Sequence, residues 1–157
     1  MLILEKILRF VEKIASMAKD IFHDQFRRAL EKDGWSITHD PFSFRVLGLE
    51  GEVDLGAEKI LAAEKTQDGQ KVRIVVEIKS FIGPSFMRDF HVAVGQYTNY
   101  KVFIGVVDAE RQIYLAVTKT VFDKKFTIPG VQLVLQVAGI KVVTFDEVLE
   151  TIVLWEN

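Results

Sequence analysis

The chain has 157 residues, of which 49% are apolar, and this length allows one domain with a substantial buried core. It contains no cysteine, which excludes disulfides and thiolate metal sites, and its three histidines lack the close spacing of a zinc site. A formal net charge of −2 excludes the overall basic character of a non-specific nucleic-acid-binding protein. Any metal is therefore expected to bind mainly oxygen ligands, and any contact with DNA to be local.

The N-terminal segment has the pattern of a long amphipathic helix. Apolar residues follow one another at intervals of four and three from Leu4 to Ala29, and no Gly or Pro interrupts them before Gly34. Charged residues such as Lys6 and Arg9 occur too often for a signal peptide or a membrane span. The pattern predicts one helix in a soluble, cytoplasmic protein that does not enter a membrane.

The middle of the chain predicts a hairpin followed by a helix. The dipeptide Asp68-Gly69 is a strong turn signal, so residues 55–62 and 72–80 are expected to pair as antiparallel strands. A second helix is predicted over 83–101, because four apolar residues there share one stripe at helical spacing: Phe86, Phe90, Ala93 and Tyr97.

The other expected elements are short. Strands are predicted at 35–42, 102–107, 113–118, 140–145 and 151–157, turns at 46–52 and 108–112, and a short helix at 119–126, whereas the apolar segment 131–139 favours no element. The helix at 83–101 separates the strand at 72–80 from the next expected strand, which allows a parallel crossover. We therefore expect an α/β fold with a central mixed β-sheet flanked by helices.

The strand at 72–80 is apolar but carries two charges, in the segment VEIKS. Side chains alternate along a strand, so Glu77 and Lys79 point to the same face. An Asp on one strand followed by Glu-x-Lys on its neighbour resembles the signature of the PD-(D/E)xK nuclease superfamily, with Asp54, Glu77 and Lys79 in the three positions. The resemblance implies a restriction-endonuclease-like fold and a Mg²⁺-dependent endonuclease that hydrolyses phosphodiesters.

Mg²⁺ or Mn²⁺ suits these residues because both ions prefer oxygen ligands. Asp54 and Glu77 would supply carboxylates, and Ile78 would supply its backbone carbonyl. Lys79 would orient or activate a metal-bound water and stabilise the negative charge that develops at phosphorus. Gln96 begins the segment QYTNY, which resembles the Gln-x-x-x-Tyr element of RecB-like branches of this superfamily, and this resemblance adds Gln96 to the candidate catalytic residues.

The same residues have a structural alternative. Glu77 and Lys79 at a strand end would then form an ion pair with no catalytic role. Gln96 would belong to a solvated helix edge.

The second acid of the site has two candidates. Pairing about the Asp68-Gly69 turn places Glu58 opposite Lys79 and leaves Asp54 beyond the end of the strand. Either Gly56 marks a bulge that brings Asp54 back to the site, or Glu58 is the second acid and the rival metal ligand.

Several longer segments resemble the XisH family, known as fdxN element excision controlling factors of cyanobacteria. They are KDIFHDQFRRALEKDGWSITHDP, VDLGAEKILAAEK, VEIKSFIG, VGQY and IYLAV, within residues 17–155. The resemblance implies a cytoplasmic accessory factor for developmentally regulated, site-specific excision of a DNA element. Its partners would be DNA, an XisI-like protein and, indirectly, a site-specific recombinase. The alternative is a non-catalytic adaptor that uses the nuclease scaffold to bind XisI.

Residues 1–16 precede the family-like region, which begins at Met17. We therefore expect an N-terminal helical extension at 1–16 and an endonuclease-like domain at 17–157. The extension carries an apolar stripe that a compact domain has no room to bury, formed by Leu4, Ile7, Leu8 and Val11. The stripe is expected to find a partner, which would make the chain a homo-oligomer through its N-terminal helix.

Overall fold

The computed structural model describes residues 2–46, 48–51 and 60–157. Its helical elements are α1 (Leu2–Lys32), α2 (Phe86–Val107), α3 (Lys119–Val121), the π-helical turn η1 (Phe122–Phe126) and α4 (Pro129–Ala138). Its strands are β1 (Ser36–His39), β2 (Phe44–Val46), β3 (Leu49–Gly51), β4 (Ile60–Gln67), β5 (Gln70–Ile78), β6 (Gln112–Thr118), β7 (Val142–Asp146) and β8 (Thr151–Glu156).

The main sheet has six strands in the order β1-β4-β5-β6-β7-β8. Strands β5, β6 and β7 run parallel, whereas β1–β4, β4–β5 and β7–β8 are antiparallel pairs, so the sheet is mixed. The turn at Asp68-Gly69 joins β4 to β5, and their pairing runs without a break to Ile60 opposite Glu77. These findings confirm the predicted α/β class and the predicted hairpin.

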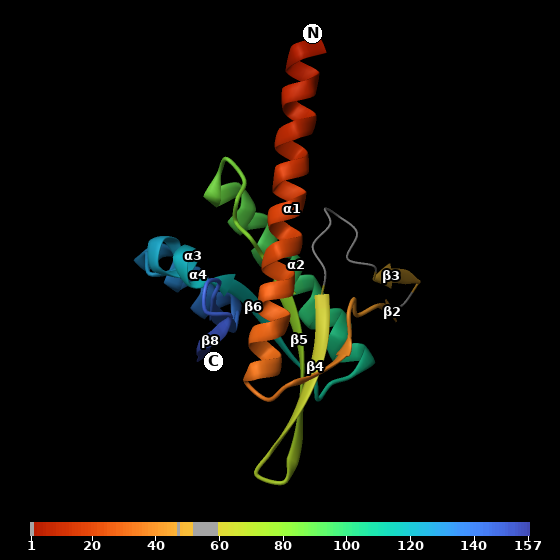
Figure 1. Ribbon diagram of the computed structural model, residues 1–157. Helices are drawn as coiled ribbons and strands as arrows, with labels where there is room; N and C mark the ends of the chain where they lie inside the picture. Colours follow the sequence, from red (N-terminus) through yellow and green to blue (C-terminus); the bar gives the residue numbers. More distant parts are fainter. Residues whose placement is uncertain (1, 47, 52–59) are drawn as a thin grey trace.

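Helices cover both faces of the sheet (Figure 1). One face packs against α1, where Phe26, Ala29 and Leu30 are fully buried. The other face packs against α2 and α4, with Phe90, Tyr97 and other apolar residues in its core. Two successive parallel crossovers, β5–α2–β6 and β6–α4–β7, explain this division, because crossovers of the same hand place their helices on the same face.

Only the C-terminal part of α1 belongs to this core. Its buried residues begin at His23, whereas all side chains from Leu2 to Ile14 are exposed. Figure 1 shows the N-terminal half of α1 extending beyond the rest of the molecule. The helix ends at Lys32. Two residues later Gly34 has a φ of +90°, a conformation that suits glycine and terminates helices.

The predicted strand at 102–107 is wrong, because these residues form the last turns of α2. The segment is rich in branched apolar residues, which favour strands. However, Ile104 continues the buried stripe of Phe90, Ala93 and Tyr97, and this unbroken helical spacing outweighs the local preference.

Two other segments differ from expectation in a smaller way. Part of the predicted turn at 46–52 forms the β2–β3 hairpin, a separate antiparallel pair. The apolar segment 131–139 lies largely in α4, which begins at Pro129, a favoured residue in the first turn of a helix. The predicted strand at 55–62 is described from Ile60 onward, and Asp54, Gly56 and Glu58 lie outside the described residues.

Candidate functional site

Glu77 and Lys79 lie at the C-terminal end of β5, in the middle of the sheet. Glu77 is paired with Ile60 of β4 on one side and with Leu115 of β6 on the other. The backbone N–H of Lys79 donates to the carbonyl of Ala116 at 3.0 Å, so the ladder with β6 continues one residue past the strand. The backbone of Glu77 is therefore fixed by pairing on both sides, and that of Lys79 by its hydrogen bond to β6.

The two charges form an ion pair away from solvent. Lys79 Nζ lies 3.2 Å from Glu77 Oε1, as the alternation of side chains along the strand predicts. Glu77 has no exposed surface, and Lys79 is only 9% exposed. Lys79 Nζ also donates to Gln96 Oε1 on α2. The structure thus brings three predicted site residues, Glu77, Lys79 and Gln96, into one cluster between β5 and α2.

The position of Gln96 is set by its neighbour Tyr97. The buried Tyr97 hydroxyl donates to the carbonyl of Ile113 at 2.9 Å and accepts from the backbone N–H of Lys141 at 3.1 Å. Burial raises the pKa of Tyr97 to about 12, so the hydroxyl stays protonated and keeps both bonds at neutral pH. These bonds tie α2 to the starts of β6 and β7 and hold Gln96 beside Lys79.

The donors for a divalent cation are only partly within the described chain. The carboxylate of Glu77 is a hard oxygen ligand of the kind that Mg²⁺ prefers, and the backbone carbonyl of Ile78 follows it. Within residues 2–46, 48–51 and 60–157, no group of three or more His, Asp and Glu side chains is placed to hold a metal ion. Asp54 and Glu58, the candidates for the second carboxylate, lie outside these ranges, so the metal site stays a prediction.

A second charged cluster joins α1 to the segment after β1. Asp40 Oδ1 lies 2.8 Å from His23 Nε2, and Arg27 Nη1 donates to Asp40 Oδ2 at 2.7 Å. Burial opposes ionisation of Asp40, but its hydrogen bonds and Coulomb attraction to His23 and Arg27 outweigh burial and lower the pKa of this carboxyl. We interpret the cluster as a tether that fixes α1 to the edge of the sheet.

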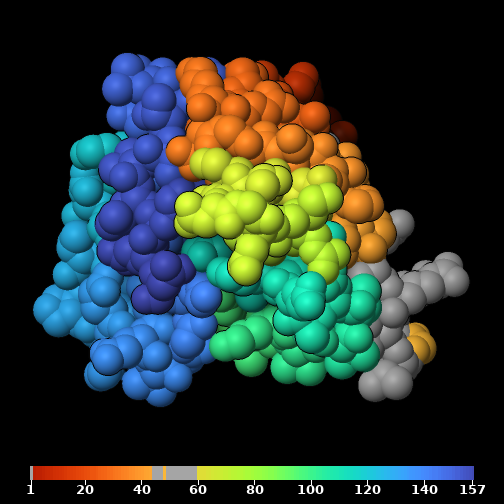
Figure 2. Space-filling view, turned by 90° about the horizontal axis from the view of Figure 1, so that it is seen from below, coloured from red at the N-terminus to blue at the C-terminus, as the bar shows by residue number. Residues whose placement is uncertain are grey.

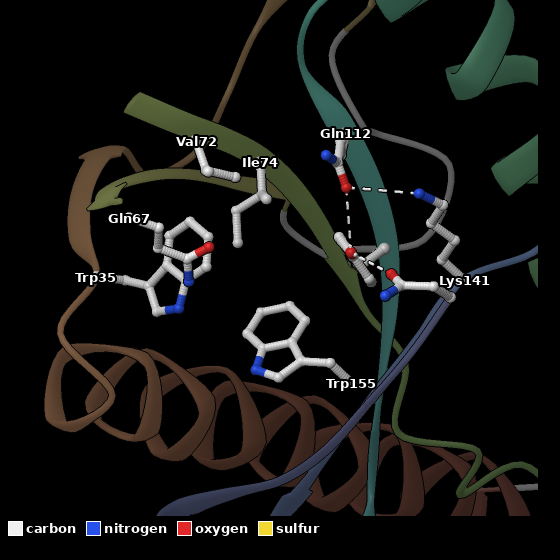
Figure 3. Close-up of a pocket in the computed structure, with 9 residues that line it drawn as sticks. Trp35, Gln67, Val72, Ile74, Gln112, Lys141 and Trp155 are labelled. Carbon is white, nitrogen blue, oxygen red and sulfur yellow. Dashed lines mark hydrogen bonds between the residues drawn. The ribbon is translucent and has the colours of Figure 1, made fainter. Parts of the chain in front are cut away.

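Sequence reasoning missed a pocket of about 500 Å³ at the opposite end of the sheet from Lys79 (Figure 3). Its aromatic lining consists of Trp35, Tyr114 and Trp155, which come from distant parts of the chain. No spacing pattern connects them, so only the folded chain reveals that they lie together.

Together these features define an α/β protein with a mixed six-stranded sheet whose central strand ends in a buried Glu-x-Lys pair. The family model described as "XisH protein" matches residues 16–153, and the chain belongs to the XisH family.

Two crystal structures support this membership. The chain is 36% identical to an XisH family protein from Nostoc punctiforme PCC 73102, with a TM-score of 0.77 over 87% of this chain and 99% of that one. It is 35% identical to an fdxN element excision controlling factor protein from Anabaena variabilis, with a TM-score of 0.77 over 88% of this chain and 99% of that one. No curated protein matches the chain. None of the helices in the described ranges has the length and apolar character needed to cross a membrane.

Proposed function

We propose that the chain is an accessory factor in the site-specific excision of a DNA element, which contacts DNA at the end of β5. Membership of the XisH family supports the general role, since a similar protein from Anabaena variabilis is an fdxN element excision controlling factor. The cluster of Glu77, Lys79 and Gln96 is the observation that carries the contact with DNA. It combines a carboxylate, a cation and an amide at the end of a parallel strand, where α/β proteins commonly place their sites.

In this proposal the site hydrolyses a DNA phosphodiester in the manner of the PD-(D/E)xK nucleases. The metal ion, Mg²⁺ or Mn²⁺, would be held by Glu77, the backbone carbonyl of Ile78 and Asp54. Glu58 is the alternative to Asp54. When bound, the ion would act as a Lewis acid and activate a water. Lys79 would stabilise negative charge on the phosphate, and Gln96 would hold the Lys79 ammonium in place through the hydrogen bond it accepts.

A cleavage assay tests this activity directly. The full chain is incubated with supercoiled, linear and branched DNA, with Mg²⁺, with Mn²⁺ and with EDTA. We expect metal-dependent cleavage that Glu77→Gln and Lys79→Gln abolish. Gln96→Ala, which removes the acceptor of the Lys79 hydrogen bond, should slow cleavage. Its matched control, Gln136→Ala, changes an exposed amide on α4 and should cleave normally. Cleavage that survives Glu77→Gln would contradict the catalytic role.

A second function, a non-catalytic adaptor, is favoured by the burial of the charged pair. A carboxylate with no exposed surface is held in an ion pair with Lys79, which is the arrangement expected of a structural pair in a retained scaffold. The chain would then bind an XisI-like protein, while a site-specific recombinase exchanges the DNA strands. Complex formation with an XisI-like protein on a sizing column, together with no cleavage by the wild-type chain, would support the adaptor.

We also propose that the exposed stripe of α1 is covered by a second copy of this chain. Nine large apolar side chains between Leu2 and Met17 are each at least half exposed. They offer on the order of 1,000 Å² of surface per copy, which is enough for a stable dimer interface. The polar side of the same segment carries mixed charges, including Glu5, Lys6 and Arg9, so it selects neither an acidic nor a basic partner. The family model matches from residue 16, so eight of these nine side chains lie N-terminal to the matched region.

A further inference from the structure

The aromatic pocket is built where the two edge strands of the sheet come together under the end of α1. Trp35 directly precedes β1 and Trp155 lies in β8, yet their ring centroids are only 5.5 Å apart, with the planes tilted by 42°. Tyr114 of β6 packs its ring against Trp155 at 4.9 Å, nearly perpendicular. Figure 2 shows this underside, where the yellow β4–β5 hairpin adjoins the orange segment after α1 and the dark-blue C-terminal strand.

The three rings differ in exposure. Trp35 and Tyr114 are buried at 7% and 6% exposure, whereas Trp155 is only partly buried. Val72 and Ile74 of β5 complete an apolar surface beside the rings (Figure 3). A flat apolar group that enters the pocket can therefore lie against an indole without displacing the core.

The rim of the pocket is polar and rich in amides. Gln67, Gln112 and Asn157 contribute three carboxamides, each of which can donate and accept hydrogen bonds. The Tyr114 hydroxyl lies 2.7 Å from Asn157 Oδ1 and 3.2 Å from Gln112 Oε1, which orients both amides.

One cation completes the rim. Lys141 Nζ donates to Gln112 Oε1 at 3.5 Å and lies 5.8 Å from the centre of the Tyr114 ring. Among the side chains that line the pocket in the described part of the chain, that of Lys141 is the charged one, which favours a ligand with a negative group at its edge.

We infer that this pocket binds an unpaired nucleobase, stacked on Trp155 and held at its edges by Gln112 and Asn157, with Lys141 near the attached phosphate. A base is apolar on its faces and carries donors and acceptors along its edges, and this is the distribution of the pocket's aromatic and amide groups. A volume of about 500 Å³ accommodates a ligand of nucleotide size. A proline-rich peptide would also use the aromatic rings, but it gives no role to Lys141 and leaves most amide donors without a partner.

The inference rests on the proposed function for the choice of DNA as the source of the base, but its site is separate. Ile74 lines the pocket and Lys79 lies five residues further along the chain, directly after β5, so the two sites are about 17 Å apart along the strand direction. Base binding also requires no divalent cation. The two proposals can therefore fail independently.

Tryptophan fluorescence offers a direct test, because the chain has two tryptophans and both line this pocket. The full chain is titrated, in EDTA, with deoxynucleoside monophosphates, with single-stranded oligonucleotides and with a blunt duplex of the same sequence. We expect saturable quenching by single strands or by nucleotides and much weaker quenching by the duplex, whose bases are already stacked. Saturation by mononucleotides would identify a free nucleotide as the ligand, and saturation only by oligonucleotides would identify a base within a strand.

Three variants, each checked for folding by circular dichroism and urea, locate the binding. Trp155→Ala, with Trp35 as the remaining reporter, should raise the Kd about tenfold, the size of a typical base–aromatic stacking contact. Gln112→Ala should raise it about threefold, the size of one hydrogen bond. Gln136→Ala, which changes an exposed amide on α4, should leave the Kd unchanged.

Three results would overturn the inference. They are the absence of saturable quenching by every nucleotide and oligonucleotide, an affinity that neither Trp155→Ala nor Gln112→Ala changes, and saturation by a proline-rich peptide with no response to single strands.

Discussion

Lys79 Nζ lies 3.2 Å from Glu77 Oε1 in a strand whose two faces are both covered, and the pair has almost no contact with solvent. Burying two charges is costly, and the cost is offset only while both partners are present. The pair therefore links the candidate site to the stability of the domain.

Replacement of one member of the pair should destabilise the domain strongly. Glu77→Gln removes the carboxylate that lies 3.2 Å from the buried Lys79 ammonium, so we expect the free energy of unfolding to fall by about 3–5 kcal/mol. Glu77→Gln combined with Lys79→Met should lose less than the sum of the two single variants, because the second change removes the remaining charge. Urea unfolding of the wild type, the two single variants and the double variant measures the coupling energy between Glu77 and Lys79. Strictly additive losses would show that the two charges do not stabilise one another.

Calorimetric measurement of metal binding can decide whether Asp54 or Glu58 is the second acid of the site. We expect the wild-type chain to bind Mn²⁺ weakly without DNA, since two carboxylates supply only part of an octahedral shell. Asp54→Asn should abolish the calorimetric signal, as should Glu77→Gln, whereas Glu58→Gln should retain it. Retention in Asp54→Asn and loss in Glu58→Gln would assign the role to Glu58 instead.

Much of the fold follows from local patterns. The spacing of apolar residues predicts α1, and the Asp68-Gly69 turn predicts the β4–β5 pair, because each element is encoded within its own segment. The strand predicted at 102–107 fails for the opposite reason. Its residues favour strands, but Ile104 lies on the same buried face of α2 as Phe90, Ala93 and Tyr97. The burial of that face depends on how the helix lies on the sheet.

The candidate site likewise combines a contact that a local pattern predicts with contacts that depend on tertiary packing. The proximity of Glu77 and Lys79 follows from alternation along one strand. The contact between Lys79 and Gln96 depends on the docking of α2, which the buried Tyr97 hydroxyl fixes through Ile113 and Lys141, and no sequence pattern contains those bonds. The aromatic pocket is harder still, because its tryptophans come from opposite edges of the sheet.

The tether at Asp40 predicts a pH-dependent contribution to stability. Its pKa is lowered in the folded protein, so its stabilisation is fully present above the unfolded pKa of about 3.9 and is lost as the pH falls through the lower folded value. Asp40→Asn should reduce the free energy of unfolding by about 2 kcal/mol at pH 7, because it weakens charged hydrogen bonds to His23 and Arg27.

The difference between wild type and Asp40→Asn should shrink at pH 3, because this pH lies below the unfolded pKa of about 3.9, so unfolding is favoured by proton uptake at Asp40. Urea titrations at pH 7, 5 and 3 measure it. Asp20→Asn, at an exposed position on α1, the helix that carries His23 and Arg27, is the control and should be nearly neutral throughout. A difference that stays constant from pH 7 to pH 3 would show that the charge of Asp40 does not stabilise the fold.

Removal of residues 2–16 should separate association from folding. The first buried residue of α1 is His23, so the deleted segment contributes little to the core, and the melting temperature should change by less than about 3 °C. The same deletion exposes no new apolar surface but removes the stripe that includes Ile7, Phe10 and Ile14, so light scattering should report a monomer where the full chain forms dimers.

Ile7→Lys with Ile14→Lys in the full chain should give the same monomer, whereas Lys6→Ala with Lys13→Ala on the polar side should remain dimeric. A large fall in melting temperature on deletion would show that the stripe packs on its own domain, and a full chain that is monomeric at high concentration would rule out the second copy as its partner.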